Sequence, residues 1–408
     1  MDPPVPKHLL RSHSSPITAL YCSDDNKRIY SADSSGLVVV TSSFALRAIT
    51  SWKAHSDGVL GVEEWENSVI THGRDNKLHV WACIHDLPEA SGLEGSSSSS
   101  LLGPQPTLNY SMDVNALNYC RFSLLRSPMF AKSNCKAEDS SLSKESWIAL
   151  PNLVESSEVD IWTLPSCDRL HAAIGKSAHS STLDSNGRGE HGIIMALHLF
   201  STISSPTLSS SSSSTHTGAH LRLLTAYENG RVILREYSTP GKAKSVEGRG
   251  WEAIWNVKLH NEAILAMRVS RDNSLAITAS ADHLLGRYEI NQSDSSANVS
   301  YSVHRTKHPG NSAIALRDDG RICAIGGWDG KIRLYSSKSF KPLGTLRYHK
   351  GHCQALEFAR SLPETTSTDE TEEEDELTED EKLRRSRWLL GGAQDNRVSI
   401  WELITFEK

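Results

Sequence analysis

The sequence lacks the features that mark secreted or membrane-spanning proteins. Its seven cysteines are scattered, odd in number and contain no Cys-x-x-Cys pair, so we expect a reducing compartment rather than a disulfide framework. The first residues, MDPPVPKHLLRSH, hold no apolar run of signal-peptide length. The longest apolar stretch, Ile193 to Phe200, is interrupted by His198 and is too short to span a membrane.

Motifs of catalysis and metal binding are also missing. No G-x-S-x-G or H-E-x-x-H occurs. The stretch GGWDGK at 326–331 approaches a phosphate-binding loop, but Ile332 stands where a Ser or Thr would hold magnesium. His349, His352 and Cys353 are close together, yet no second cluster supplies the remaining ligands of a zinc site. We therefore predict no catalytic residue, no cofactor and no metal.

The charge is concentrated in one acidic run. Eleven acidic residues and no basic one lie between Glu364 and Glu381, which leaves 43 basic against 38 acidic residues elsewhere. That excess is too small to predict nucleic-acid binding. The run at 364–381 is either a solvated loop or a docking strip for a basic partner, regulated by phosphorylation. The basic residues at 382–387 are either a nuclear-import signal or partners for these acids.

The sequence instead contains a repeat, Asp-x-x-apolar-x-apolar-aromatic. Good copies begin at Asp75, Asp329 and Asp395, and a fourth begins at Asp282. Weaker copies begin at positions 35, 156 and 229, and the tightest spacings are 40 and 47 residues. Seven units of this period, rich in alternating strands, predict an all-β, seven-bladed WD40 β-propeller with four strands per blade.

Each unit of this kind is fastened by a polar network. The Asp carboxylate in a turn accepts a hydrogen bond from a His that precedes the blade. The other ring nitrogen of that His bonds to a Ser or Thr hydroxyl, and the hydroxyl oxygen accepts from the Trp indole N–H. We predict that only the second unit holds all four groups, because Thr41 and Arg235 replace Trp in the first and fourth. An acid–base role for His55 and Asp75 is the alternative, but their recurrence favours structure. The predicted network residues are His55, Thr71, Asp75, Trp81, His260, Asp282, Asp329, His349, Asp395 and Trp401.

We predict a single domain over 1–408, closed by the first and last strands. Residues 7–10 resemble an outer strand that would pair with the strand at 398–401, so that deleting 1–12 should destabilise the protein. Polar insertions expected to stay mobile are 86–106, 126–146, 176–190, 201–219 and 361–386. All except 176–190 should open on one face, which leaves the opposite face or the blade rim as the expected interaction surface.

Several stretches go beyond the generic repeat. They are ITHGRDNKLHVW (70–81), MDVNALNYC (112–120), ALPNLVESSEVDIWTLP (149–165), TAYENGRV (225–232), TASADHLLGRYEI (278–290) and 306–358. In these stretches the chain resembles the ASTRA-associated protein 1 family. VNALNYC and PNLVESSEVDIW are the most specific, because blade geometry does not require them.

The resemblance implies a non-enzymatic scaffold subunit of the ASTRA complex, linked to chromatin remodelling and to maturation of phosphatidylinositol-3-kinase-related kinases. The implied partners are RuvB-like AAA+ ATPases, kinase co-chaperones and a large pseudokinase, without membrane or direct nucleic-acid binding. The implied protein is a monomer within a hetero-complex, in the nucleus and also in the cytoplasm. Candidate partner contacts are Asn115, Asn118, Tyr119, Asn152, Glu155, Trp328, Lys350 and His352.

Two other functions stay open. A WD40 substrate receptor of a ubiquitin ligase usually carries Asp-x-Arg after the blade aromatic, but Ala82, Thr163 and Glu402 follow the three tryptophans. A histone-tail reader would need an acidic or aromatic channel mouth. A G-protein β role is disfavoured because no coiled-coil helix precedes the first repeat.

Overall fold

The computed structural model describes residues 4–83, 104–117, 119–126, 145–176, 191–203, 219–239, 244–290, 300–361 and 378–404. These residues form seven four-stranded sheets and a single seven-residue helix. No helix in the described ranges has the length and apolarity to cross a membrane. The chain separates into two compact units, Met1–Asp113 with Leu265–Lys408, and Val114–Ile264. The single domain predicted over 1–408 stays a prediction.

The first unit holds five sheets, which we call blades 1, 2, 5, 6 and 7. Blade 1 is β2 (Ile17–Cys22), β3 (Arg28–Asp33), β4 (Leu37–Ser42) and β5 (Ala48–Lys53); blade 2 is β6 (Val59–Trp65), β7 (Ser68–Gly73), β8 (Lys77–Ala82) and β9 (Leu108–Asp113). Blade 5 is β18 (Ile264–Val269), β19 (Leu275–Ser280), β20 (Leu284–Glu289) and β21 (Tyr301–Arg305); blade 6 is β22 (Asn311–Leu316), β23 (Ile322–Gly327), β24 (Lys331–Ser336) and β25 (Pro342–Arg347). Blade 7 is β26 (Cys353–Phe358), β27 (Trp388–Ala393), β28 (Val398–Glu402) and β1 (His8–Leu10).

The second unit holds blades 3 and 4. Blade 3 is β10 (Ser123–Leu125), β11 (Ser146–Pro151), β12 (Val159–Leu164) and β13 (Arg169–Ile174). Blade 4 is β14 (Ile194–Ile203), β15 (Ala219–Tyr227), β16 (Arg231–Tyr237) and β17 (Trp251–Lys258). The unit has its own apolar core, which includes Ile161, Leu199 and Leu223.

Burial follows the position of each strand in its blade. The second strands β11, β19 and β27 are buried at all six positions, as expected for strands covered on both faces. The outer strands β17 and β21 are largely exposed. Seven sheets of four strands, taken in chain order except for the last, define a seven-bladed β-propeller. The predicted fold class is confirmed.

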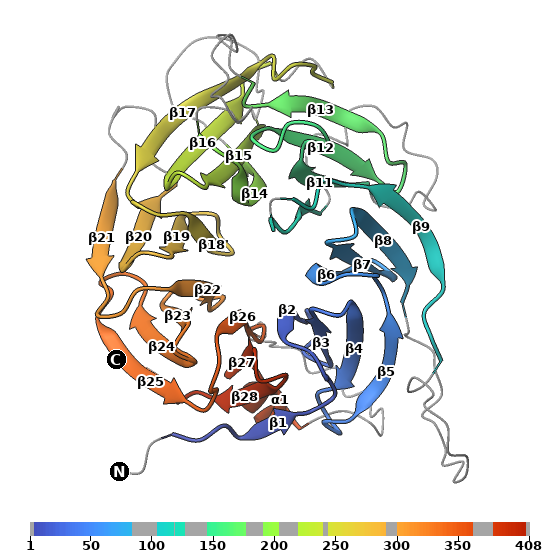
Figure 1. The fold of residues 1–408 in the computed structure, drawn as a ribbon, viewed down its shortest axis with the longest axis vertical. Helices are drawn as coiled ribbons and strands as arrows, with labels where there is room; N and C mark the ends of the chain where they lie inside the picture. Colours follow the sequence, from blue (N-terminus) through green and yellow to red (C-terminus); the bar gives the residue numbers. More distant parts are fainter. Residues whose placement is uncertain are drawn as a thin grey trace. The chain divides into compact units, whose positions relative to one another are not determined.

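The last blade is completed by the first strand. β1 lies beside β28 (Figure 1), with His8 opposite Ile400 and Leu10 opposite Val398. The Lys7 N–H donates to the Ile400 carbonyl at 2.8 Å. Leu10 is buried in the core of this blade. The closure expected from the sequence is therefore present, and an otherwise open strand edge is paired.

One predicted insertion is partly helical. Most of the five insertions lie outside the described residues, but helix α1 (Glu379–Arg385) forms at the end of 361–386 and is capped by Thr378. Arg385 is buried, donates to Ser43 Oγ at 3.2 Å, and lies 5.7 Å from the rings of Phe44 and Trp388. The expectation of a mobile loop is wrong for this end, because the Arg385 guanidinium fixes the helix. Likewise, β14 reaches Ile203 and β15 starts at Ala219, so both ends of 201–219 are strand.

Candidate functional site

Blade 2 contains a complete four-residue network. His55 Nδ1 lies 2.9 Å from Asp75 Oδ1, and His55 Nε2 lies 2.8 Å from Thr71 Oγ1. The Trp81 indole N–H donates to the same Thr71 oxygen at 2.9 Å. Asp75, in the turn between β7 and β8, also accepts from the Ser56 N–H at 2.9 Å. Every polar group has a partner, so the network fastens the blade.

Electrostatics match this structural arrangement. Burial lowers the pKa of His55, so the imidazole is neutral at physiological pH. Burial alone would raise the pKa of Asp75, but the Ser56 N–H and the neighbouring His55 lower it overall. The pair thus rests as imidazole and carboxylate, with both ring nitrogens already engaged.

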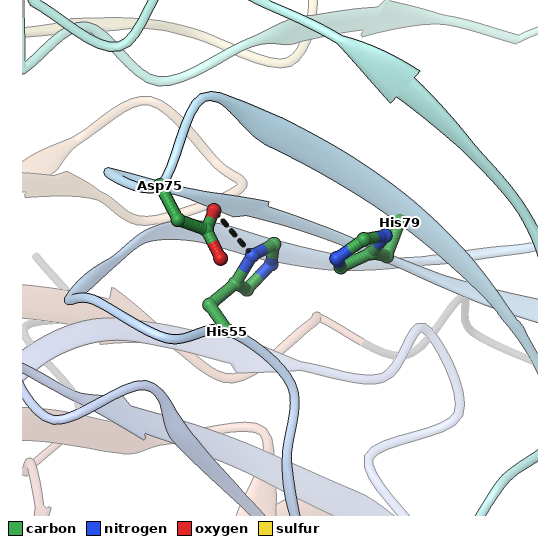
Figure 2. A group of neighbouring side chains, drawn as sticks. All are labelled: His55, Asp75 and His79. Atoms are coloured by element: carbon green, nitrogen blue, oxygen red, sulfur yellow. Dashed lines mark hydrogen bonds and ion pairs between the residues drawn. The ribbon is translucent and has the colours of Figure 1, made fainter.

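A third group, His79, approaches the same place (Figure 2). Ligand atoms of His55, Asp75 and His79 lie within 4.8 Å of one another. The two imidazoles stack with centroids 4.7 Å apart and planes at 20°. Because nitrogen lone pairs lie in the ring plane, stacked rings do not converge on one ion. The geometry favours a stacked pair beside the network over a metal centre.

Blade 7 holds a second complete network, which the sequence reasoning missed. His349 Nδ1 is 3.0 Å from Asp395, and His349 Nε2 is 2.8 Å from Ser399 Oγ. The Trp401 indole donates to Ser399 Oγ at 2.9 Å. The prediction that only the second unit is complete is wrong, because the hydroxyl comes from β28 rather than β27. A Ser two residues before the blade Trp was the available signal.

A glycine makes this substitution possible. Gly391, opposite Ser399 on β27, stands where blade 2 has Thr71. A Cβ at Gly391 would lie 3.0 Å from Ser399 Oγ and 2.6 Å from the end of Ile332. The missing side chain therefore leaves room for the serine hydroxyl.

Blade 1 has three of the four groups. His13 bridges Asp33 and Ser31, each at 2.8 Å. Thr41 occupies the Trp position, and its buried hydroxyl has no hydrogen-bond partner among the described residues. The blade therefore relies more on packing, as its sequence suggested.

Blade 4 has a polar residue at the position of the blade aromatic, and the two predicted network residues of blade 5 are buried. Arg235 replaces Trp in blade 4 and donates to Thr225 Oγ1 at 2.9 Å and to the Tyr227 hydroxyl at 3.1 Å. His260 and Asp282 are buried, and Asp282 Oδ1 accepts from the Leu284 N–H at 2.8 Å.

In blade 6, Asp329 pairs with Arg333 rather than with a histidine. Arg333 Nη2 lies 2.6 Å from Asp329 Oδ2, and Lys331 Nζ lies 3.2 Å from the same oxygen. Burial opposes ionisation, but these cations hold the pKa of Asp329 far below its usual value. The expectation that Asp329 joins a His-based network is therefore wrong.

Two candidate partner contacts of blade 3 are buried instead. Asn115 Nδ2 donates to the Asn152 carbonyl at 2.8 Å and to Ser156 Oγ at 3.0 Å. Asn152 Oδ1 accepts from the N–H groups of Val154 and Glu155, both at 2.9 Å. Both side-chain amides are used to shape the turn, and a partner contact of Asn115 or Asn152 stays a prediction. Asn118 lies outside the described residues.

The turns that contain these two amides expose apolar side chains to solvent. The blade 3 patch consists of Leu117, Tyr119, Leu153 and Val154, and Val154 is 89% exposed. Glu155 follows it on the same turn and is partly exposed. Sequence reasoning named Tyr119 and Glu155 but missed the three aliphatic side chains, since alternation alone does not tell an exposed Val from a buried one.

The other three candidate contacts gather in the first unit. The Trp328 surface consists of Trp328, Lys350 and His352. Trp328 is 47% exposed, and its ring meets that of His352 edge-on at 5.8 Å. Lys350 is exposed. His352 Nε2 lies 2.6 Å from Ser312 Oγ, and burial lowers the pKa of its ring.

The zinc alternative for 349–353 does not assemble. Both nitrogens of His349 are engaged in the blade 7 network. His352 faces Ser312. Cys353 is buried in the apolar core between β22 and β27.

Comparisons with known proteins agree with this architecture. The family model described as "WD domain, G-beta repeat" matches residues 4–41 and 301–336. The solved β-propeller domain of Cps50 (Swd1) from Myceliophteria thermophila has a TM-score of 0.61 at 11% identity, and the match covers 98% of this chain and 100% of that one. These matches agree with the seven-bladed β-propeller fold, and two stretches of the chain are similar to the WD repeat.

The chain is also similar to several curated proteins that share one name. ASTRA-associated protein 1 of Aspergillus niger is 28% identical, over 98% of this chain and 97% of its own length. The proteins of that name from Verticillium alfalfae and Schizosaccharomyces pombe are 28% and 27% identical, over 99% and 87% of this chain and over 94% and 93% of their own lengths. The resemblance to the ASTRA-associated protein 1 family is confirmed and extends along nearly the whole chain.

Proposed function

We propose that this protein is a non-enzymatic scaffold subunit of an ASTRA-type assembly. The observation that carries the proposal is the pairing of saturated interior networks with exposed apolar side chains on fixed turns. In the His–Asp pairs of blades 2 and 7, both ring nitrogens of each histidine are already hydrogen-bonded. The blade 3 patch and the Trp328 surface instead present exposed apolar and aromatic side chains.

The partners follow from the resemblance. They are RuvB-like AAA+ ATPases, kinase co-chaperones and a large pseudokinase, which links the protein to chromatin remodelling and kinase maturation. The names of the relatives support membership in such a complex. We propose the nucleus as the main location, with the cytoplasm as a second one.

Two surfaces favour a scaffold over a single-ligand receptor. The blade 3 patch and the Trp328 surface belong to different compact units, and each is held by its own hydrogen bonds. A ubiquitin-ligase receptor remains the alternative, although Asp-x-Arg is missing after Trp81 and Trp401.

Affinity purification of the full chain with quantitative mass spectrometry tests the proposal. We expect RuvB-like ATPases and kinase co-chaperones above the level seen with an unrelated tagged propeller. Recovery of cullin adaptors in their place would overturn the proposal. Fluorescence imaging of the tagged chain tests the location, and exclusion from the nucleus would contradict it.

A further inference from the structure

Trp328 is held in an exposed position by the surrounding backbone. It lies in the turn between β23 and β24, where its N–H donates to the Gly310 carbonyl at 2.9 Å. Gly310 has a φ of +80°, and a Cβ there would come within 2.4 Å of the indole. The ring therefore rests on bare backbone, with His352 at its edge.

Trp328 does not occupy the aromatic position of the blade 6 repeat. The aromatic residue of the blade 6 repeat is Tyr335, which is 7% exposed and packs in the core. Trp328 is nevertheless 47% exposed. Tryptophan is the residue type most enriched among those that dominate binding energy at protein interfaces.

The uncompensated charges around this ring are positive. Lys350 lies two residues before His352, and Lys307 lies three residues before Gly310, and both are exposed. Within the described part of the chain, neither lysine has an ion pair or hydrogen bond. Asp329, the acidic neighbour, is already paired with Arg333 and Lys331.

We propose that the Trp328 surface binds an acidic segment of a partner protein that places an apolar or aromatic side chain on the indole. Carboxylates of that segment pair with Lys307 and Lys350, and the apolar side chain covers the ring. A basic segment would meet like charges. A nucleic acid is disfavoured because two free lysines neutralise too few phosphates for stable binding. The inference rests on the scaffold function and names the partner's chemistry at one surface.

Site-specific photo-crosslinking of the full chain in cells tests this inference. Benzoylphenylalanine at position 308, an exposed histidine beside Lys307, labels whatever occupies the surface. We expect the crosslinked peptide to be rich in Asp and Glu and to contain an apolar residue. Crosslinking should fall roughly tenfold or more with Trp328→Ala and also fall with Lys350→Glu. Tyr301→Ala, which removes a 52% exposed aromatic side chain of the neighbouring blade, should leave it unchanged.

The outcomes separate this inference from the scaffold proposal. Absence of a crosslink, a crosslink to nucleic acid or to a basic peptide, or an unchanged yield with Trp328→Ala overturns the inference. If RuvB-like ATPases still co-purify in that case, the scaffold function stands. If an acidic peptide is labelled but RuvB-like ATPases and kinase co-chaperones do not co-purify, the inference about this surface stands and the scaffold proposal fails. Thermal unfolding of each variant confirms that the fold is retained.

Discussion

Replacing Ser399 by alanine tests whether the blade 7 network is as important as the one in blade 2. The serine oxygen joins His349 Nε2 at 2.8 Å and the Trp401 N–H at 2.9 Å. Both partners are buried, Trp401 being 2% exposed. The substitution leaves two buried polar atoms without partners. Each costs about 1–3 kcal/mol, so we expect a loss of about 2–6 kcal/mol in the free energy of unfolding.

Thr41→Val is the matched control from blade 1. It removes a hydroxyl that is equally buried but has no partner among the described residues, in exchange for a methyl group of similar size. Because a buried hydroxyl without a hydrogen bond is unfavourable, we expect a change between zero and a gain of about 1 kcal/mol. The two variants together separate loss of a network from loss of any buried hydroxyl.

Thermal unfolding monitored by circular dichroism measures both variants. A loss of about 2–6 kcal/mol corresponds to a melting temperature lower by roughly 2–7 °C for a chain of 408 residues. The network interpretation is wrong if Ser399→Ala melts within a degree of the wild type, or if Thr41→Val is destabilised as much as Ser399→Ala.

Three further predictions concern other parts of the fold. Burial lowers the pKa of His171 to about 4, so the stability that the neutral buried ring contributes is complete above pH 6.5 and is lost between pH 6.5 and 4. The loss in the free energy of unfolding should be about 3 kcal/mol. Urea unfolding at several pH values should show this loss, and His171→Gln should make the stability less dependent on pH over that range. Arg385→Ala should cost about 1–2 kcal/mol and speed tryptic cleavage within α1, whereas the exposed Arg384→Ala should leave the melting temperature unchanged; equal effects would contradict the anchoring role. Deleting residues 1–12 removes the β1 ladder and buried Leu10 and should cost about 3–6 kcal/mol, and an unchanged melting temperature would contradict closure.

The fold was accessible from the sequence because its signal is repeated. Seven copies of one hairpin pattern define the blades even where single copies are weak, and pairing of β1 with β28 follows from the need to cover an edge. The role of Ser399 was not predicted, because the repeat pattern places the network hydroxyl on the second strand of the blade, β27. In the structure the third strand, β28, supplies it.

The interaction surfaces were only partly accessible. The stretches around Asn115 and Asn152 were recognised as unusual, but a sequence does not tell whether an amide points inward to shape a turn or outward to a partner. Both point inward, and the exposed residue is the adjacent Val154. The anchoring of α1 depends on Arg385 reaching Ser43, a contact distant in sequence and hidden in a charged stretch.

The Trp328 surface lies in the blade whose sequence departs from the repeat at the position of the network histidine. In blades 2 and 7, the network His stands four residues before the first paired residue of the blade, Val59 or Cys353. The corresponding paired residue in blade 6 is Asn311, so Lys307 stands in the position of the histidine.

Without that histidine, the blade 6 turn is held from within its own hairpin. Arg333 reaches back to Asp329, and Gly327 leaves space for it, since a Cβ there would lie 2.8 Å from the guanidinium. The lysine is thus released to solvent, and Trp328 can lie on Gly310. Local departures from an otherwise consistent pattern are where function is expected, and this one replaces an internal fastening with an exposed ring beside free positive charge.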